Sequence, residues 1–166
     1  FKTIEKLSTH YDKILSIPAD EPFLFPENIN IIKNQLNTGY SITTLYTPFF
    51  YKEDIENTLS CKLITNIYDE ILYFSRYPIP FSKDKNISLY KKHIGIFIFN
   101  AHVLYDKKIW DSSFISSLHK EERLEQNRFL ELGYTIKGLQ VEHKYFGIDI
   151  PEQITQIEKR YLQLKR

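Results

Sequence analysis

At the centre of the chain lies His93-Ile94-Gly95-Ile96-Phe97-Ile98-Phe99, an almost unbroken apolar run. A strand with one solvated face alternates apolar and polar residues, whereas a run this continuous is typical of a strand covered on both faces. The run therefore predicts a strand that is covered on both faces, as helices cover the sheet of an α/β fold.

Further strands and helices alternate along the rest of the chain. Strands are predicted at 13–17, 41–47, 61–65, 71–75 and 135–142, and helices at 1–10, 27–36, 52–57, 101–108, 120–132 and 151–164. This alternation implies a mixed, mostly parallel sheet. Only Asn66 to Glu70 join the strands at 61–65 and 71–75, so these two strands are expected to form an antiparallel hairpin extension. No shift in composition divides the chain, and residues 1–166 are interpreted as a single α/β domain.

Composition narrows the class of protein. The 166 residues can bury a core, and a formal net charge of +1 leaves no basic surplus of the kind that binds nucleic acid. No stretch approaches the roughly 18 consecutive apolar residues of a membrane span. Cys61 is the only cysteine, which excludes an internal disulfide and fits the reducing cytoplasm. We expect its thiol to be inert in the core.

The start of the chain reads as the interior of a longer sequence. The chain contains no methionine, and Phe1, Ile4 and Leu7 recur at helical spacing. We therefore expect the natural N-terminus to lie upstream of Phe1.

Two aspartates stand near opposite ends of the chain, each expected where a strand stops. Asp20 lies in Pro18-Ala19-Asp20-Glu21-Pro22, and Asp149 lies in Gly147-Ile148-Asp149-Ile150-Pro151-Glu152. Ligands of open α/β sheets bind beyond the carboxyl ends of the strands. Two carboxylates there can hold one divalent cation, which is the usual centre of phosphoryl or nucleotidyl transfer. The alternative for each aspartate is a turn or helix cap.

Two further polar side chains border predicted strands. Arg76 follows the strand at 71–75 and precedes the stiff segment Pro78-Ile79-Pro80, so its guanidinium suits a carboxylate or phosphate ligand. Its alternative role is a surface ion pair. His93 begins the apolar run and is either a hydrogen-bonded structural residue or a donor to a ligand oxygen.

A dense polar stretch, Glu121 to Arg128, lies on the helix predicted at 120–132. Glu121 and Glu125 form a like-charge pair four residues apart, which is unfavourable unless a cation or ligand is near. The alternative is an ordinary solvated helix face.

Five segments, taken in order, resemble the CMP-sugar synthetases, most closely the 3-deoxy-manno-octulosonate (KDO) cytidylyltransferase family. They are Asp20-Glu21-Pro22, Leu72-Tyr73-Phe74-Ser75-Arg76-Tyr77-Pro78-Ile79-Pro80, His93-Ile94-Gly95-Ile96, Leu124-Glu125-Gln126-Asn127-Arg128 and Gly147-Ile148-Asp149-Ile150-Pro151-Glu152. They extend over almost the whole chain, so the resemblance is not confined to one motif.

The resemblance implies an α/β fold of the nucleotide-sugar-transferase type and a cytoplasmic homodimer. It implies coupling of CTP to the anomeric hydroxyl of an ulosonic acid with release of pyrophosphate, for lipopolysaccharide or capsule biosynthesis. Asp20 and Asp149 would be the catalytic aspartates that bind Mg²⁺. The residues implied for the sugar-acid pocket are Arg76, His93, Glu125 and Gln126.

Three positions depart from the family's pattern. Pro18 and Ala19 stand where the family usually has Gln-Gly, and Phe97 stands where a tyrosine is common. The loss of these polar groups predicts a modified ulosonic acid or a repurposed site. The alternative of a related nucleotidyltransferase for another sugar acid therefore stays open. The family's loop that binds the CTP phosphates would lie upstream of Phe1. The alternative that this chain is a non-catalytic partial homologue therefore stays open.

Overall fold

The fold is built on a six-stranded sheet. The computed structural model describes residues 11–19, 26–35, 39–84, 86–111, 116–142, 148 and 151–164. The strands are β1 (Lys13–Ser16), β2 (Ile42–Pro48), β3 (Lys62–Thr65), β4 (Ile71–Ser75), β5 (Lys91–Asn100) and β6 (Ile136–Gln140). The helices are α2 (Pro26–Lys33), α3 (Ala101–Tyr105), α4 (Lys107–Trp110), α5 (Ser117–Glu122), α6 (Gln126–Glu131) and α7 (Gln153–Leu164). Two short 3₁₀ turns, η1 (Lys52–Asp54) and η2 (Ile87–Leu89), complete the elements. The helix predicted at 1–10 lies outside the described residues.

The apolar run forms a strand, β5, as predicted, and β5 is an inner strand of the sheet. The strand order is β4-β3-β5-β2-β6, and β1 also pairs with β5. One edge of β5 pairs with β2 along nearly its whole length. The other edge is divided, because β3 pairs with Lys91 and Lys92 and β1 pairs with Phe97 to Asn100. On this edge β3 and β1 are therefore separated along β5, and the middle of β5 lies between them.

The α/β class and the mixed sheet are confirmed, but the expectation of a mostly parallel sheet is wrong. Among the strand pairings of the described residues, only β2 with β6 is parallel. A parallel neighbour needs a crossover connection of a dozen or more residues, usually a helix. Here β2 and β3 are not neighbours, because β5 lies between them and pairs antiparallel with both. β4 follows β3 through a tight hairpin and therefore also pairs antiparallel.

The predicted hairpin is confirmed. β3 and β4 pair antiparallel, with Leu63 opposite Phe74. The side chain of Asn66 organises the turn, since its Oδ1 accepts hydrogen bonds from the backbone N–H of Tyr68 and of Glu70, both at 2.9 Å. Asp69 takes a left-handed conformation (φ 57°), which an aspartate tolerates better than most residues.

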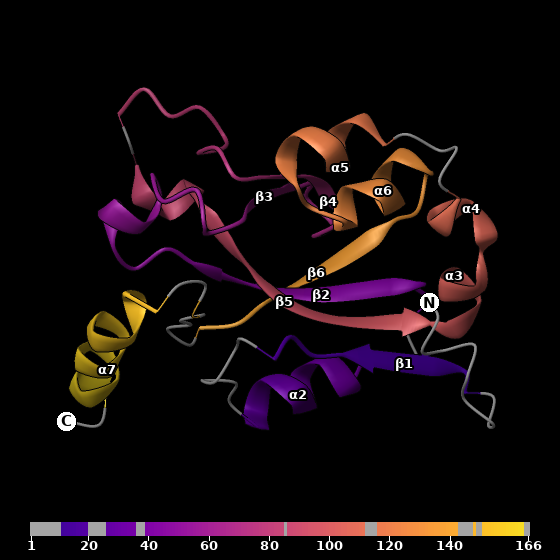
Figure 1. Ribbon diagram of the computed structural model, residues 1–166, viewed down its shortest axis with the longest axis horizontal. Helices are drawn as coiled ribbons and strands as arrows, with labels where there is room; N and C mark the ends of the chain where they lie inside the picture. The colour runs from indigo at the N-terminus through magenta and orange to yellow at the C-terminus, as the bar shows by residue number, and fades with distance from the viewer. Residues whose placement is uncertain are drawn as a thin grey trace.

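The two faces of the sheet carry separate cores, because successive side chains of a strand point to opposite faces. The three isoleucines of β5 pack with Ile32 of α2 on one face. On the other face Phe99, supported by Phe97, packs with Phe129 of α6 and with α3 and α4. In Figure 1, α2 lies below the sheet and α5 and α6 lie above it. Both faces of β5 are therefore covered, which explains its continuous apolar sequence.

The described helices are all too short or too polar to cross a lipid bilayer.

Candidate functional site

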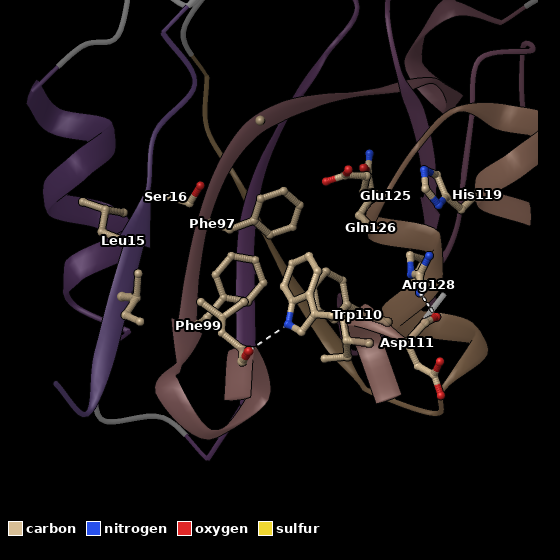
Figure 2. Close-up of a pocket in the computed structure, with 15 residues that line it drawn as sticks. Leu15, Ser16, Phe97, Phe99, Trp110, Asp111, His119, Glu125, Gln126 and Arg128 are labelled. Atoms are coloured by element: carbon tan, nitrogen blue, oxygen red, sulfur yellow. Dashed lines mark hydrogen bonds between the residues drawn. The ribbon is translucent and has the colours of Figure 1, made fainter. Parts of the chain in front are cut away.

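A cavity of about 670 Å³ opens where β3 and β1 divide the edge of β5. Its lining comes from β1, β5 and the helices from α3 to α6 (Figure 2). The residues that line it are Ile14, Leu15, Ser16, Gly95, Phe97, Phe99, Leu104, Ile109, Trp110, Asp111, His119, Glu125, Gln126, Arg128 and Phe129. Ligand pockets commonly have volumes of about 300 to 1,000 Å³, so this one can hold a sugar-sized molecule.

One wall of the cavity is aromatic. The rings of Phe97 and Phe99 stack with centroids 5.3 Å apart, and Phe99 lies 5.4 Å from Phe129. Trp110 is fixed by a hydrogen bond from its Nε1 to the Leu104 carbonyl at 2.8 Å. This wall suits the C–H face of a ligand rather than its hydroxyl groups.

The opposite wall is polar and comes from α5, α6 and the end of α4. Glu125 is exposed and Gln126 is half-buried, and both line the cavity together with His119, Arg128 and Asp111. Figure 2 shows Glu125 and Gln126 across from Phe97 and Ser16. A carboxylate and an amide offer acceptors and donors for sugar hydroxyls. The cavity thus combines an aromatic wall with polar groups that can orient a ligand.

Glu125 and Gln126 reach the cavity because the chain turns sharply before them. A single helix was predicted over 120–132, and this prediction is wrong: α5 ends at Glu122 and α6 begins at Gln126. Arg123 has a left-handed backbone (φ 53°, ψ 42°), which ends α5. The change of direction brings the first residues of α6 to the cavity. Gly133 ends α6, with φ 83°, as expected.

His93 lies behind the aromatic wall and is not among the residues that line the cavity. Its ring contacts Phe97 and Phe74, with centroids 5.2 and 4.9 Å away. Its Nε2 lies 2.9 Å from the Thr44 hydroxyl, which itself lies 2.7 Å from the Ile96 carbonyl. The hydroxyl has one proton and donates it over the shorter distance, so His93 donates from Nε2 to Thr44.

Burial lowers the pKa of His93 to about 3, so its ring is neutral at pH 7. The contact with Thr44 stands at a bulge, where the register of β2 against β5 shifts between Thr44 and Leu45. Gly95, in the bulged part of β5, exposes strand backbone to the cavity. The geometry gives His93 a structural role in shaping this wall, and its contact with a sugar stays a prediction.

Arg76 also lies away from the cavity lining. Its Nη1 donates to the carbonyls of Thr58 and Leu59 at 3.0 and 3.2 Å, and its Nε donates to the Glu122 carbonyl at 3.1 Å. The guanidinium therefore ties the loop before β3 to the end of α5. Its predicted role as a partner of the sugar carboxylate stays a prediction.

Asp20 and Asp149, the predicted metal ligands, lie outside the described residues. The chain leads toward Asp20 from Ser16, which ends β1 and lines the cavity. Ile148, beside Asp149, is half-buried. Within the described residues there is no group of three or more His, Cys, Asp or Glu side chains that could hold a metal ion.

Several residues of the cavity were not singled out from the sequence. Phe99 and Trp110 belong to the wall, and Arg128 and His119 carry polar groups into it. Arg128 stands in one of the five family-like segments, which was the one signal available. The others come together only through tertiary packing, in which Phe99 of β5 shares a core with α4 and α6.

Comparisons with known proteins agree with this architecture. The chain matches the cytidylyltransferase family over residues 2–138. The 3-deoxy-manno-octulosonate cytidylyltransferase of Parabacteroides distasonis is 37% identical over 165 residues, which covers 93% of this chain and 64% of the relative. That of Fusobacterium nucleatum is 36% identical over 152 residues, which covers 90% of this chain and 60% of the relative. The chain thus spans less than two thirds of the length of these curated relatives.

Solved structures share the fold. The CMP:2-keto-3-deoxy-manno-octonic acid synthetase complexed with CTP superposes with a TM-score of 0.81 at 23% identity, over 98% of this chain and 66% of that one. A 4-diphosphocytidyl-2C-methyl-D-erythritol synthase from Anaerococcus prevotii superposes with a TM-score of 0.58 at 14% identity, over 98% of this chain and 64% of that one. The family match extends over far more than half of the sequence, and the chain therefore belongs to the cytidylyltransferase family.

Proposed function

We propose that the protein couples CTP to a 3-deoxy-ulosonic acid, KDO or a close relative, to give a CMP-sugar and pyrophosphate for lipopolysaccharide or capsule biosynthesis. The observation that carries the proposal is the cavity between Glu125, Gln126 and the end of β1, from which the chain continues toward Asp20. Membership of the cytidylyltransferase family and the names of the curated relatives support it.

In the proposed reaction the anomeric hydroxyl oxygen of the sugar attacks the α-phosphorus of CTP, the bond to pyrophosphate breaks, and the hydroxyl proton is released. Such a transfer depends mainly on positioning and on charge neutralisation. Glu125 and Gln126 would hold the sugar hydroxyls while the aromatic wall receives its C–H face. No covalent enzyme intermediate is required.

Asp20 and Asp149 would hold Mg²⁺ in this proposal. Carboxylate oxygens are the ligands that this hard cation prefers, so the donor set fits it. When bound, the ion would neutralise charge on the phosphates of CTP. Arg76 would pair with the sugar carboxylate and His93 with a sugar oxygen, and both would have to exchange a present hydrogen bond for the ligand.

Loss of either aspartate should greatly reduce turnover. We expect D20A and D149A to lower pyrophosphate release by the full-length protein by about 10²-fold or more, because one of two metal carboxylates is lost. D84A, at an exposed turn, is the matched control and should retain normal activity. Chelation with EDTA should stop the reaction and added Mg²⁺ should restore it. Near-normal rates in both D20A and D149A would refute the metal assignment.

A second candidate is a related nucleotidyltransferase that uses another sugar acid. The apolar wall formed by Phe97 and Phe99 favours a ligand with fewer hydroxyl groups on that side. A panel of nucleotides and sugar acids separates the two, since exclusive use of CTP and KDO would eliminate the second candidate. A folded full-length protein that turns over no pair would instead be a non-catalytic homologue.

The proposed assembly is a cytoplasmic homodimer. Exposed apolar side chains on and beside the hairpin strand β4, at Leu72, Tyr77 and Phe81, are compatible with a partner surface. Light scattering on the purified protein would measure its mass, and a monomer at micromolar concentration would refute this part of the proposal.

A further inference from the structure

We propose that Glu122 and Asn127 are positioning residues that clamp the turn between α5 and α6 onto the edge of β4 and so aim Glu125 and Gln126 into the cavity. The inference rests on the proposed function, since it assigns those two side chains to the sugar. Glu122 and Asn127 do not line the cavity, and each acts through the backbone of the turn.

Asn127 binds the free edge of β4. Its side chain is fully buried, its Nδ2 donates to the Phe74 carbonyl at 3.0 Å, and its Oδ1 accepts from the Phe74 N–H at 3.3 Å. An amide offers the same donor and acceptor as a neighbouring strand would. Because β4 is an outer strand of the sheet, its edge needs such a partner. Asn127 therefore attaches the first turn of α6 to the sheet.

Glu122 binds the end of the same strand. Its carboxylate accepts hydrogen bonds from the hydroxyls of Tyr73 and Ser75 at 2.9 and 2.7 Å and from the Arg76 N–H at 2.8 Å. Burial acts to raise the pKa of Glu122, but these hydrogen bonds outweigh it and lower the pKa below its ordinary value. The carboxylate is therefore ionised at neutral pH. Arg76 returns a bond from its Nε to the Glu122 carbonyl.

The segment between the two anchors is short. It consists of Arg123, with its left-handed backbone, Leu124, which is buried, and the two cavity residues Glu125 and Gln126. Within it the Asn127 N–H donates to the Leu124 carbonyl at 3.1 Å. With both ends fixed to β4, the segment has little freedom to rotate. The direction of Glu125 and Gln126 thus depends on two side chains that never reach the cavity.

The far ends of the two helices are also joined. Ser116, which caps α5, donates a hydrogen bond to the carboxylate of Glu131 at the end of α6, and Ser117 donates to the same carboxylate at 3.1 Å. The two helices are therefore joined at both ends, and their attachment to β4 positions the pair against the sheet. A displacement of about 1 Å at a reacting centre can cost about 10²-fold in rate.

The test compares Michaelis constants for the two substrates in the full-length protein. We expect N127A to raise KM for the sugar acid by about 10-fold while KM for CTP changes by less than about 2-fold. E122Q should also raise KM for the sugar acid, because the amide N–H₂ group of glutamine would face one of the three groups that donate hydrogen bonds to the Glu122 carboxylate. The control is N66A, which removes a similar amide from the turn at the other end of β3 and β4 and should leave both constants unchanged.

Each outcome decides the inference. Folded N127A and E122Q with an unchanged KM for the sugar acid, in a wild-type protein that is active, would overturn it and leave the proposed function intact. If N127A does not fold, the KM of E122Q for the sugar acid decides the inference in the same way. If the wild-type protein turns over no substrate pair, the proposed function fails. Amide hydrogen exchange then decides the positioning role: faster exchange at 123–126 in N127A than in N66A supports the clamp, and equal exchange refutes it.

Discussion

Burial keeps the imidazole of His93 uncharged, and this has a measurable consequence for stability. The pKa falls from 6.5 to about 3 on folding, so below pH 6.5 the unfolded chain binds a proton that the folded protein does not. Stability contributed by His93 is therefore complete above pH 6.5 and is lost as the pH falls toward 3. The loss is about 1.4 kcal/mol for each pH unit well below 6.5.

We expect H93Q to reduce this pH dependence, because glutamine does not titrate and its amide can still donate to Thr44. Urea denaturation at pH 7, 6 and 5 measures the free energy of unfolding of each protein. H102Q, at an exposed histidine of α3, should keep the wild-type slope. Equal acid sensitivity in H93Q and the wild-type protein would contradict a neutral buried ring.

Cys61 and Lys62 are neighbours in the sequence, and burial has a different consequence for the ionisable group of each. Burial raises the pKa of the Cys61 thiol to about 12, which agrees with the inert cysteine expected from the sequence. Lys62 is fully buried, yet its ammonium group donates to the carbonyls of Asn57, Ser60 and Arg76 at 2.6 to 2.9 Å. The local sequence does not predict the burial of Lys62, because its three acceptors are backbone carbonyl groups from two loops.

At the scale of the elements, the break between α5 and α6 depends on the backbone of Arg123. A left-handed conformation costs a residue with a Cβ roughly 1–2 kcal/mol, and glycine avoids this cost. We expect R123G to raise the free energy of unfolding by about 0.5–1 kcal/mol, since the arginine side chain is exposed. R123A keeps the Cβ and should give no such gain. Stabilisation of both variants to the same extent would place the effect in the side chain rather than in the backbone.

The same break marks the limit of what the sequence predicts about the elements. Arginine is a good helix former, so nothing at Arg123 signals an end to the helix. Glu122 accepts hydrogen bonds from Tyr73 and Ser75 of β4, and Asn127 exchanges hydrogen bonds with the backbone of Phe74. These contacts impose the break instead. By contrast, β5 and the β3–β4 hairpin were predicted from local patterns alone. The alternation of strands and helices does not fix which strands are neighbours in the sheet, which is why the expectation of a mostly parallel sheet was wrong.

At the scale of the whole molecule, the cavity joins segments from opposite parts of the sequence. β1 forms one side and α6 the other, with β5 between them. Sequence analysis identified Glu125 and Gln126 because their segment resembles a known family. Phe99 and Trp110, by contrast, line the site only because of tertiary packing. Such contacts have no local pattern, so sequence analysis recovers the polar half of the site better than its aromatic half.

This arrangement predicts that a sugar acid protects distant segments together. Saturating KDO without nucleotide should slow amide hydrogen exchange in both β1 and α6, because a ligand in the cavity touches both and opening either would release it. Exchange in the β3–β4 turn, Asn66 to Glu70, should not change, since this turn lies outside the cavity lining. Mass spectrometry of peptic fragments measures all three segments in one experiment. A smaller pocket of about 370 Å³ is lined by residues 39–41, 70 and 133–135. Protection confined to those residues would instead place the sugar there and refute the assignment of the larger cavity.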